Sequence, residues 1–137
     1  MTESGVYTIT IATPTDDIEK VHEMLEDVWA KSPSVSTTDR LSFETALIEL
    51  SSNVIRHADD GSGIRCVLTV GVSDARIEAR LTDTGMASKV ELVGRMMPEE
   101  FAESGRGIAL IQALVDELEY VRSGSSNHWR ISRSRTA

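Results

Sequence analysis

The sequence predicts a two-layer α/β sandwich, an α+β fold in which helices cover one face of a mixed, mainly antiparallel sheet. Segments with alternating apolar residues, which are typical of half-buried strands, follow one another in pairs that short turns can join. Segments with apolar residues at helical spacing separate these pairs. The resulting order, β-α-α-β-β-loop-α-β-β, places helices on one face of a sheet built from hairpins. The 137 residues match the size of one domain, residues 1–137.

The first half of the chain predicts one strand and two helices. Residues 6–12 alternate between apolar and polar side chains and predict the first strand. Asp16 and Glu19 have the spacing of a capping box, which predicts the start of the first helix. A second helix is predicted over residues 39–58, and its inward face carries Phe43, Leu47, Leu50 and Val54.

The second half predicts two strands, a long loop, a helix and two closing strands. Residues 64–72 alternate as a half-buried strand, on which Cys66 is predicted to be a buried, inert thiol. The next strand ends just before Asp83. Residues 84–104 show no sustained period, and a loop of that length in a compact domain is usually functional or mobile. The remaining elements are a third helix from about Gly105 and strands near 119–122 and 128–133.

Charge and composition exclude several classes of protein. A net charge of −8 argues against general nucleic-acid binding, which requires a basic surface. The N-terminus lacks the basic start and apolar stretch of a signal peptide. No apolar run approaches the roughly 18 residues that a membrane-spanning helix requires. We therefore expect a cytoplasmic protein with no membrane segment.

Glu49 and Asn53 form the first candidate site. They lie four residues apart in the predicted second helix, so their side chains project one above the other on its surface. A carboxylate can act as a general base, and a carboxamide oxygen can bind a hard cation such as Mg²⁺. Arg56 continues the same polar stripe. Taken alone, this spacing is more typical of a solvated helix face.

Asp83 ends a predicted strand and is followed by Thr84 and Gly85. A carboxylate at this position can accept a hydrogen bond from an exocyclic amino group such as adenine N6, and the glycine lets a base approach the backbone. The alternative is an Asx turn, of which Asp-Thr-Gly is a common composition.

The segment Gly105-Arg106-Gly107 is predicted to open the third helix. Free amides at a helix N-terminus bind phosphate readily, and Arg106 can add positive charge. The alternative is that Gly-x-Gly only ends a flexible loop. The segment is neither a Walker loop nor a Rossmann fingerprint. Its position after the Glu49/Asn53 and Asp83/Gly85 pairs predicts a nucleotide site.

These three motifs resemble those of a known superfamily. Residues 46–58, Ala-Leu-Ile-Glu-Leu-Ser-Ser-Asn-Val-Ile-Arg-His-Ala, resemble the N box of the Bergerat-fold ATPases. Residues 83–85 resemble the first glycine box, and residues 105–111, Gly-Arg-Gly-Ile-Ala-Leu-Ile, resemble the second. Through residue 120 the sequence is most similar to bacterial anti-sigma-factor serine kinases. The resemblance spans nearly the whole chain.

The resemblance implies that the chain binds ATP and Mg²⁺ beneath a lid formed by residues 86–104. It implies that Asn53 is a metal ligand, that Glu49 is the base activating an acceptor serine, and that Asp83 reads adenine. The other nucleotide-binding residues that it implies are Arg56, Gly85, Gly105, Arg106 and Gly107. It also implies a homodimer that sequesters a sigma factor and phosphorylates a serine of an anti-sigma-factor antagonist.

The first glycine box departs from the superfamily pattern at Ala87. The pattern continues as Asp-x-Gly-x-Gly/Pro, whereas this chain continues with Met86 and Ala87, which alters the predicted hinge of the lid. Two other functions stay open, and this departure supports the first of them. One is a non-catalytic, partner-binding regulator with a structural nucleotide or none, which the presence of Glu49 disfavours. The other is the detached ATPase domain of a sensor histidine kinase.

Overall fold

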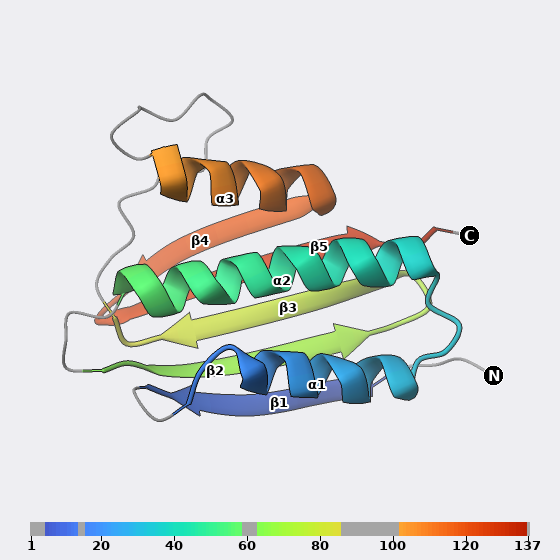
Figure 1. Cartoon of the computed structure of the whole chain (residues 1–137), viewed down its shortest axis with the longest axis horizontal. Helices are drawn as coiled ribbons and strands as arrows, with labels where there is room; N and C mark the ends of the chain where they lie inside the picture. The colour runs from blue at the N-terminus through green and yellow to red at the C-terminus, as the bar shows by residue number, and fades with distance from the viewer. Residues whose placement is uncertain (1–4, 14–15, 59–62, 86–101, 137) are drawn as a thin grey trace.

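The computed structural model describes residues 5–13, 16–58, 63–85 and 102–136 of the chain. Within these residues the elements are β1 (Gly5–Ala12), α1 (Glu19–Ala30), α2 (Thr37–Ala58), β2 (Arg65–Val72), β3 (Arg76–Asp83), α3 (Ala102–Leu114), β4 (Glu117–Ser123) and β5 (Ser126–Ser134) (Figure 1). Their order is the predicted one. None of the helices in the described part of the chain is long and apolar enough to cross a membrane.

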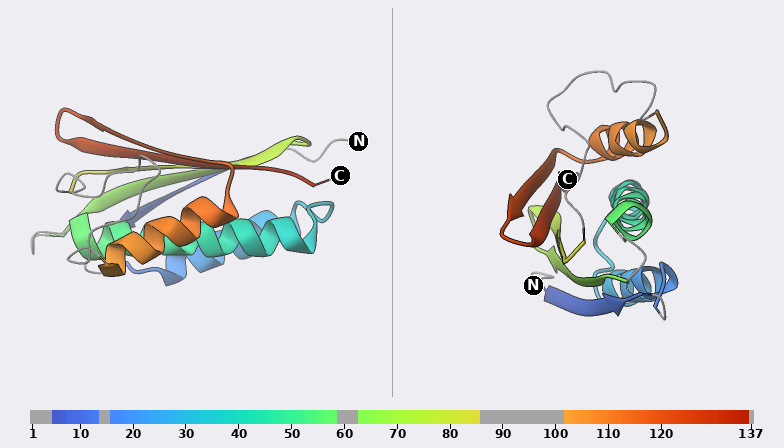
Figure 2. Two further views of the ribbon diagram at one scale, coloured as in Figure 1. Left: turned by 90° about the horizontal axis from the view of Figure 1, so that it is seen from above. Right: turned by 90° about the vertical axis from the view of Figure 1, so that its left-hand side faces the viewer.

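The five strands form one sheet in the order β1-β2-β3-β5-β4, and each neighbouring pair is antiparallel. All three helices lie against the same face, so the molecule has one helical layer and one sheet layer (Figure 2). The predicted two-layer α+β sandwich is therefore confirmed. Two hairpins, β2–β3 and β4–β5, supply four of the five strands, and β3 pairs with β5 rather than with β4.

The core lies between the two layers. Alternate residues of the strands face the helices, because successive side chains of a strand point to opposite faces. The helical stripes predicted from the sequence supply the other half of the core. The fully buried side chains include Leu25, Phe43, Leu47, Leu50, Leu68, Ile77, Leu81, Ile111 and Ile131. This packing fixes α2 across the middle of the sheet, where it carries most of the predicted site.

The capping box predicted for α1 is wrong. The residue before the helix is Ile18, and it forms no side-chain capping bond. Asp16 instead accepts a hydrogen bond from the backbone amide of Ala12 at 2.8 Å, which closes the reversal between β1 and α1. Asp17 takes the local role, accepting from the amide of Glu19 at 3.0 Å.

The third helix begins earlier than the sequence predicts. It starts at Ala102 rather than near Gly105, so residues 102–104 of the predicted lid belong to α3. Residues 86–101, the rest of that lid, lie outside the described residues, as does Ala87. The sequence places the start too late because Gly105 and Gly107 have low helix propensity. Glycine disfavours a helix interior by about 1 kcal/mol relative to alanine.

The first turn of α2 is joined to β5 by a buried ion pair. Asp39 is fully buried, and its Oδ1 accepts a hydrogen bond from Nε of Arg133 at 2.9 Å. Arg133 also donates through Nη1 to the carbonyl of Leu114, the last residue of α3, at 2.7 Å. One guanidinium therefore connects both helices of the candidate site to the sheet.

Candidate functional site

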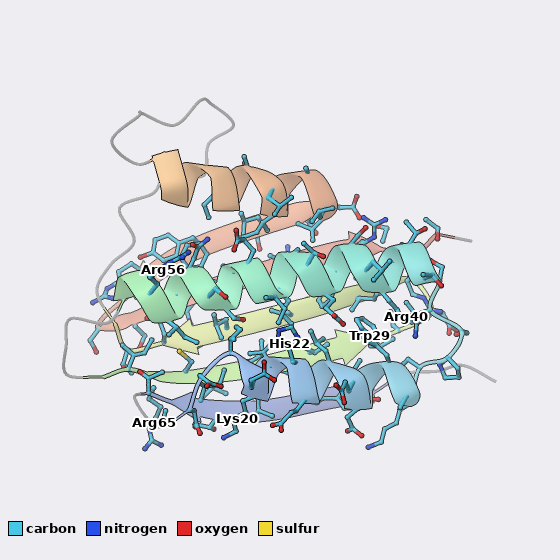
Figure 3. The ribbon with its side chains drawn as sticks, in the orientation of Figure 1. Lys20, His22, Trp29, Arg40, Arg56 and Arg65 are labelled. Atoms are coloured by element: carbon cyan, nitrogen blue, oxygen red, sulfur yellow. The ribbon has the colours of Figure 1, made fainter. Side chains whose placement is uncertain are left out.

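The predicted site residues gather at one end of the sandwich. The C-terminal end of β3, the C-terminal half of α2 and the first turns of α3 meet there (Figure 1). Arg56 lies at this end of α2, on the side toward α3 (Figure 3). The structure thus brings together residues that lie more than 50 positions apart in the sequence.

Gly107 allows α3 to approach α2 at the predicted base and metal ligand. A Cβ atom at Gly107 would lie 2.7 Å from Nδ2 of Asn53 and 3.2 Å from Oε1 of Glu49. The first distance is too short for any real side chain. The absence of a side chain at Gly107 therefore keeps this corner open to the carboxamide and the carboxylate.

Asn53 is buried and has one engaged and one open polar atom. Its Oδ1 accepts a hydrogen bond from Nη2 of Arg56 at 2.8 Å. Its Nδ2 is buried and has no hydrogen-bond partner among the described residues. Such a group costs about 1–3 kcal/mol and suits a place that a ligand fills. The oxygen is the right donor type for Mg²⁺, and a metal bound to it would replace its hydrogen bond with Arg56.

Asp83 is also fully buried, and its two oxygens differ. Oδ1 accepts hydrogen bonds from the backbone amide of Gly85 and from Nδ2 of Asn127, each at 2.8 Å. Oδ2 is buried and lacks a partner within the described part of the chain. The Asx turn considered from the sequence is therefore present, and it uses only one oxygen. The second oxygen stays available to a donor from a ligand, as an adenine reader requires.

Three residues of this region were missed by the sequence analysis. Asn127 lies opposite Asp83 in the β3–β5 pairing. Tyr120 and Arg122, both on β4, donate hydrogen bonds to Oδ1 of Asn127 at 2.5 and 3.1 Å. Arg122 also donates to the carbonyl of Gly85 at 2.7 Å. No local motif marks these residues, because only the strand register brings them beside Asp83.

Cys66 lies opposite Asp83 in the β2–β3 pairing. Its thiol is buried, as predicted. Burial, and secondarily the negative charge of Asp83, raises the pKa of the Cys66 thiol to about 12. The thiol therefore stays protonated at neutral pH and lines the site as a small apolar group, in agreement with the predicted inert cysteine.

The second glycine segment is placed differently from the prediction. The first four amides of a helix have no acceptor within it. With α3 starting at Ala102, these free amides precede Gly105, whereas the amides of Gly105, Arg106 and Gly107 belong to the interior of the helix. Gly107 contributes through its close approach to α2 instead. The side chain of Arg106 lies outside the part of the chain that the structure describes.

Residues 11–133 match the family described as the histidine kinase-like ATPase domain. The chain belongs to this family. The match covers all three motifs and the whole sheet except most of β1 and the last residue of β5. A comparison with curated protein sequences gives no match.

Within the described residues, no group of three or more His, Cys, Asp and Glu side chains could hold a metal ion.

Solved structures share this fold, among them the following three. The RsbU and RsbW domains of Rv1364c from Mycobacterium tuberculosis match with a TM-score of 0.68 and 17% identity, over 97% of this chain and 33% of that one. The histidine kinase AdeS of Acinetobacter baumannii matches at 0.52 and 17%, over 96% and 68%. The histidine kinase domain of the Erythrobacter litoralis EL346 blue-light activated kinase matches at 0.50 and 19%, over 70% and 44%. The chain therefore spans only a third of the first of these proteins.

Proposed function

We propose that this protein is an ATP-dependent protein serine kinase that also acts as an anti-sigma factor. The observation that carries the proposal is a pair of buried polar atoms at one end of the sandwich, Oδ2 of Asp83 and Nδ2 of Asn53. Both lack a hydrogen-bond partner among the described residues. We call them the open atoms. In an ATPase domain, buried groups left open in this way suit an adenine base and the phosphate end of a nucleotide.

The nucleotide lies between the two open atoms in this proposal. Asp83 accepts a hydrogen bond from the adenine amino group, and Gly85 leaves the adjoining backbone accessible. Arg56, the free amides at the start of α3 and the Arg106 side chain bind phosphate. The oxygen of Asn53 would hold Mg²⁺ in place of its hydrogen bond with Arg56. ATP would supply the phosphoryl group, and Mg²⁺ would supply charge that stabilises its transfer.

Glu49 is assigned the proton transfer. It lies one helical turn before Asn53 and faces the corner that Gly107 keeps open, since its Oε1 is 3.2 Å from the position of a Gly107 Cβ. A carboxylate in that position can accept the proton of a serine hydroxyl as the oxygen attacks the γ-phosphorus of ATP, while the bond to the β,γ-bridging oxygen breaks and ADP leaves. Phosphoryl transfer otherwise needs mainly positioning and charge stabilisation, which Arg56, Asn53 and the amides of α3 supply.

The regulatory part of the proposal rests on the motif resemblance and on a structural neighbour. The motifs resemble those of anti-sigma-factor serine kinases, and a structure containing an RsbW domain covers 97% of this chain with a TM-score of 0.68. The proposed partners are a sigma factor, which the protein sequesters, and an anti-sigma-factor antagonist, whose serine it phosphorylates. We further propose that it works as a homodimer in the cytoplasm, without direct contact with nucleic acid or membrane.

The second candidate is the ATPase domain of a histidine kinase. Two of the structural neighbours named above are histidine kinases, with TM-scores of 0.52 and 0.50. The same open atoms would then bind ATP, but the phosphate would go to a histidine of a separate domain.

Phosphate transfer by a Glu49→Gln variant tests the proposal. The variant keeps the shape of the side chain but loses its basicity, so it should bind Mg²⁺-ATP with parental affinity and transfer phosphate about 10²–10⁴-fold more slowly. The assay follows the γ-phosphate of labelled ATP onto candidate antagonist proteins and identifies the modified residue. Glu26→Gln, on the exposed face of α1, is the matched control and should transfer at the parental rate.

Three other outcomes decide against parts of the proposal. Parental transfer by Glu49→Gln removes Glu49 as the base. Label on a histidine favours the second candidate. A parental protein that binds its partners but transfers no phosphate to any of them is a non-catalytic regulator.

A further inference from the structure

The side chain of Asn127 has every hydrogen-bonding position in use. Its Nδ2 donates to Oδ1 of Asp83 at 2.8 Å and to the carbonyl of Gly85 at 3.4 Å. Its Oδ1 accepts from the hydroxyl of Tyr120 at 2.5 Å and from Arg122 at 3.1 Å. Because a carboxamide has two donors and two acceptor sites, this arrangement fixes which end of the amide faces Asp83. The residue is 1% exposed, so solvent offers it no alternative partner.

This fixed amide determines which oxygen of Asp83 is open. The donor from Asn127 and the amide of Gly85 both bind Oδ1, which leaves Oδ2 as the open atom. Without the donor from Asn127, only the Gly85 amide would orient the carboxylate. Rotation of the carboxylate about its Cβ–Cγ bond would then move the open oxygen away from its present direction.

The support for Asn127 extends across the sheet to its edge strand. Tyr120 lies opposite Trp129, and their ring centroids are 4.5 Å apart, so the position of the tyrosine ring is set by aromatic packing. Arg122 joins the same network to the carbonyl of Gly85 at 2.7 Å. Strands β4, β5 and β3 therefore act together on one carboxylate.

We propose that Asn127 is a positioning residue that makes this site select a purine with an exocyclic amino group at position 6. It does so by holding Oδ1 of Asp83, so that Oδ2 faces the base as an acceptor. A 6-amino group donates to that oxygen, whereas a 6-oxo group presents a second acceptor and leaves both buried oxygens unpaired. The inference rests on the proposed binding of ATP, and it adds a residue that does not itself touch the nucleotide.

The test compares ATP with purine riboside 5′-triphosphate, which lacks only the 6-amino group. The parental protein should prefer ATP by about 10-fold or more, as expected for a hydrogen bond to a charged group. Asn127→Leu keeps the number and branching of the side-chain heavy atoms but has no polar atoms. It should bind the two nucleotides with nearly equal affinity, while its affinity for the purine analogue stays within about 3-fold of the parental value. Titration calorimetry in the presence of Mg²⁺ gives both constants.

Two further variants separate positioning from folding. His128→Ala changes the next residue of β5, which is exposed and lies on the opposite face, and it should keep the parental preference. Tyr120→Phe removes one hydrogen bond to Asn127 and should lower the preference by about 3-fold. If Asn127→Leu does not fold, Tyr120→Phe becomes the deciding variant. An unchanged preference for ATP over the purine analogue in Tyr120→Phe then overturns the inference.

The remaining outcomes distinguish the inference from the proposed function. A parental protein that binds neither nucleotide overturns both. Equal parental affinities leave ATP binding in place but overturn the selection of the amino group. If Asn127→Leu weakens both nucleotides by the same factor, Asn127 supports only the fold and is not a positioning residue.

Discussion

Asp39 and Asp83 are both fully buried carboxylates, yet they lie at opposite ends of the sandwich and are satisfied to different degrees. Asp39 lies in the first turn of α2, and Asp83 is the last residue of β3; Figure 1 shows these element ends on opposite sides. Burying a carboxylate is costly unless its oxygens are paired. A comparison of their partners therefore separates a structural carboxylate from one held ready for a ligand.

Both oxygens of Asp39 are paired within the chain. Oδ1 accepts from Arg133, and Oδ2 accepts from the backbone amide and the hydroxyl of Thr136 at 2.8 and 3.0 Å. Burial acts to raise the pKa of Asp39, but the hydrogen bonds from Thr136 and Arg133 outweigh it. The pKa of this carboxyl therefore lies below its ordinary value of 3.8. All of its interactions serve the folded state.

Asp83 is as inaccessible to solvent as Asp39, but only one of its two oxygens has hydrogen-bond partners among the described residues. The donors at Oδ1 are the neutral groups of Gly85 and Asn127, and no cation of the described residues pairs with the carboxylate. Such an arrangement is less stable than a fully satisfied one. The difference teaches that an incompletely satisfied buried carboxylate, and not burial of charge as such, identifies the candidate site.

The largest effect is expected at the structural carboxylate. Asp39→Asn removes the charge that pairs with Arg133 and should lower the free energy of unfolding at pH 7 by about 3 kcal/mol. This value is the lower end of the range for a broken buried ion pair, because Arg133 retains some contact with solvent. Urea unfolding followed by circular dichroism measures this value. The ATP preference over the purine analogue should not change, since the network around Asp83 remains intact. A changed preference would mean that the two ends of the molecule are coupled.

The same variant has a defined pH dependence. Since the pKa of Asp39 is lower in the folded than in the unfolded protein, its stabilisation is fully present above pH 3.8 and is lost as the pH falls further. The difference in unfolding free energy between the parent and Asp39→Asn should therefore shrink below about pH 4. A difference that is constant from pH 7 to pH 3 would show that the charge of Asp39 does not stabilise the fold.

The next effect is expected at the carboxylate of the site. Asp83→Asn should weaken ATP binding by about 10–100-fold, since it replaces a charged acceptor by a neutral one. It should leave the stability of the nucleotide-free protein unchanged or higher, because it removes a buried charge that lacks a counter-ion among the described residues. Thermal unfolding with and without Mg²⁺-ATP measures both quantities. A loss of stability as large as that of Asp39→Asn would remove the distinction between the two carboxylates.

The sequence predicted the parts of this site that depend on local spacing. Glu49 and Asn53 lie one turn apart on one helix, and the strand that ends at Asp83 alternates clearly, so both could be placed without knowledge of the tertiary structure. The residues that satisfy the two carboxylates could not. Asn127 is 44 positions from Asp83, and Arg133 is 94 positions from Asp39. Such pairs depend on strand register and helix placement, which no local pattern of this chain encodes.

The errors have the same origin. The capping box failed because Asp16 accepts from the amide of Ala12, four residues earlier at the end of β1, rather than from an amide of α1. The start of α3 was placed too late because Gly105 and Gly107 have low helix propensity, whereas close packing against α2 makes Gly107 favourable there. Each error marks a place where contact between elements outweighs local preference.

The smallest effect on stability is expected at Gly107, and it tests whether the second open atom behaves like the first. Gly107→Ala gains about 1 kcal/mol of helix propensity. The new methyl group would lie 2.7 Å from Nδ2 of Asn53 and 3.2 Å from Oε1 of Glu49, and such overpacking costs about 1–3 kcal/mol. These opposing effects nearly cancel, so the melting temperature of the nucleotide-free protein should change little. Binding of Mg²⁺-ATP should nevertheless weaken by about 10-fold, because Asn53 and Glu49 must move from the open corner.

Gly71→Ala is the matched control, since a Cβ there would meet no described heavy atom within 4 Å, and it should bind like the parent. If Gly107→Ala shows the parental increase in melting temperature with Mg²⁺-ATP, the close approach of α3 serves only packing. Asp83 would then be the better supported of the two ends of the site.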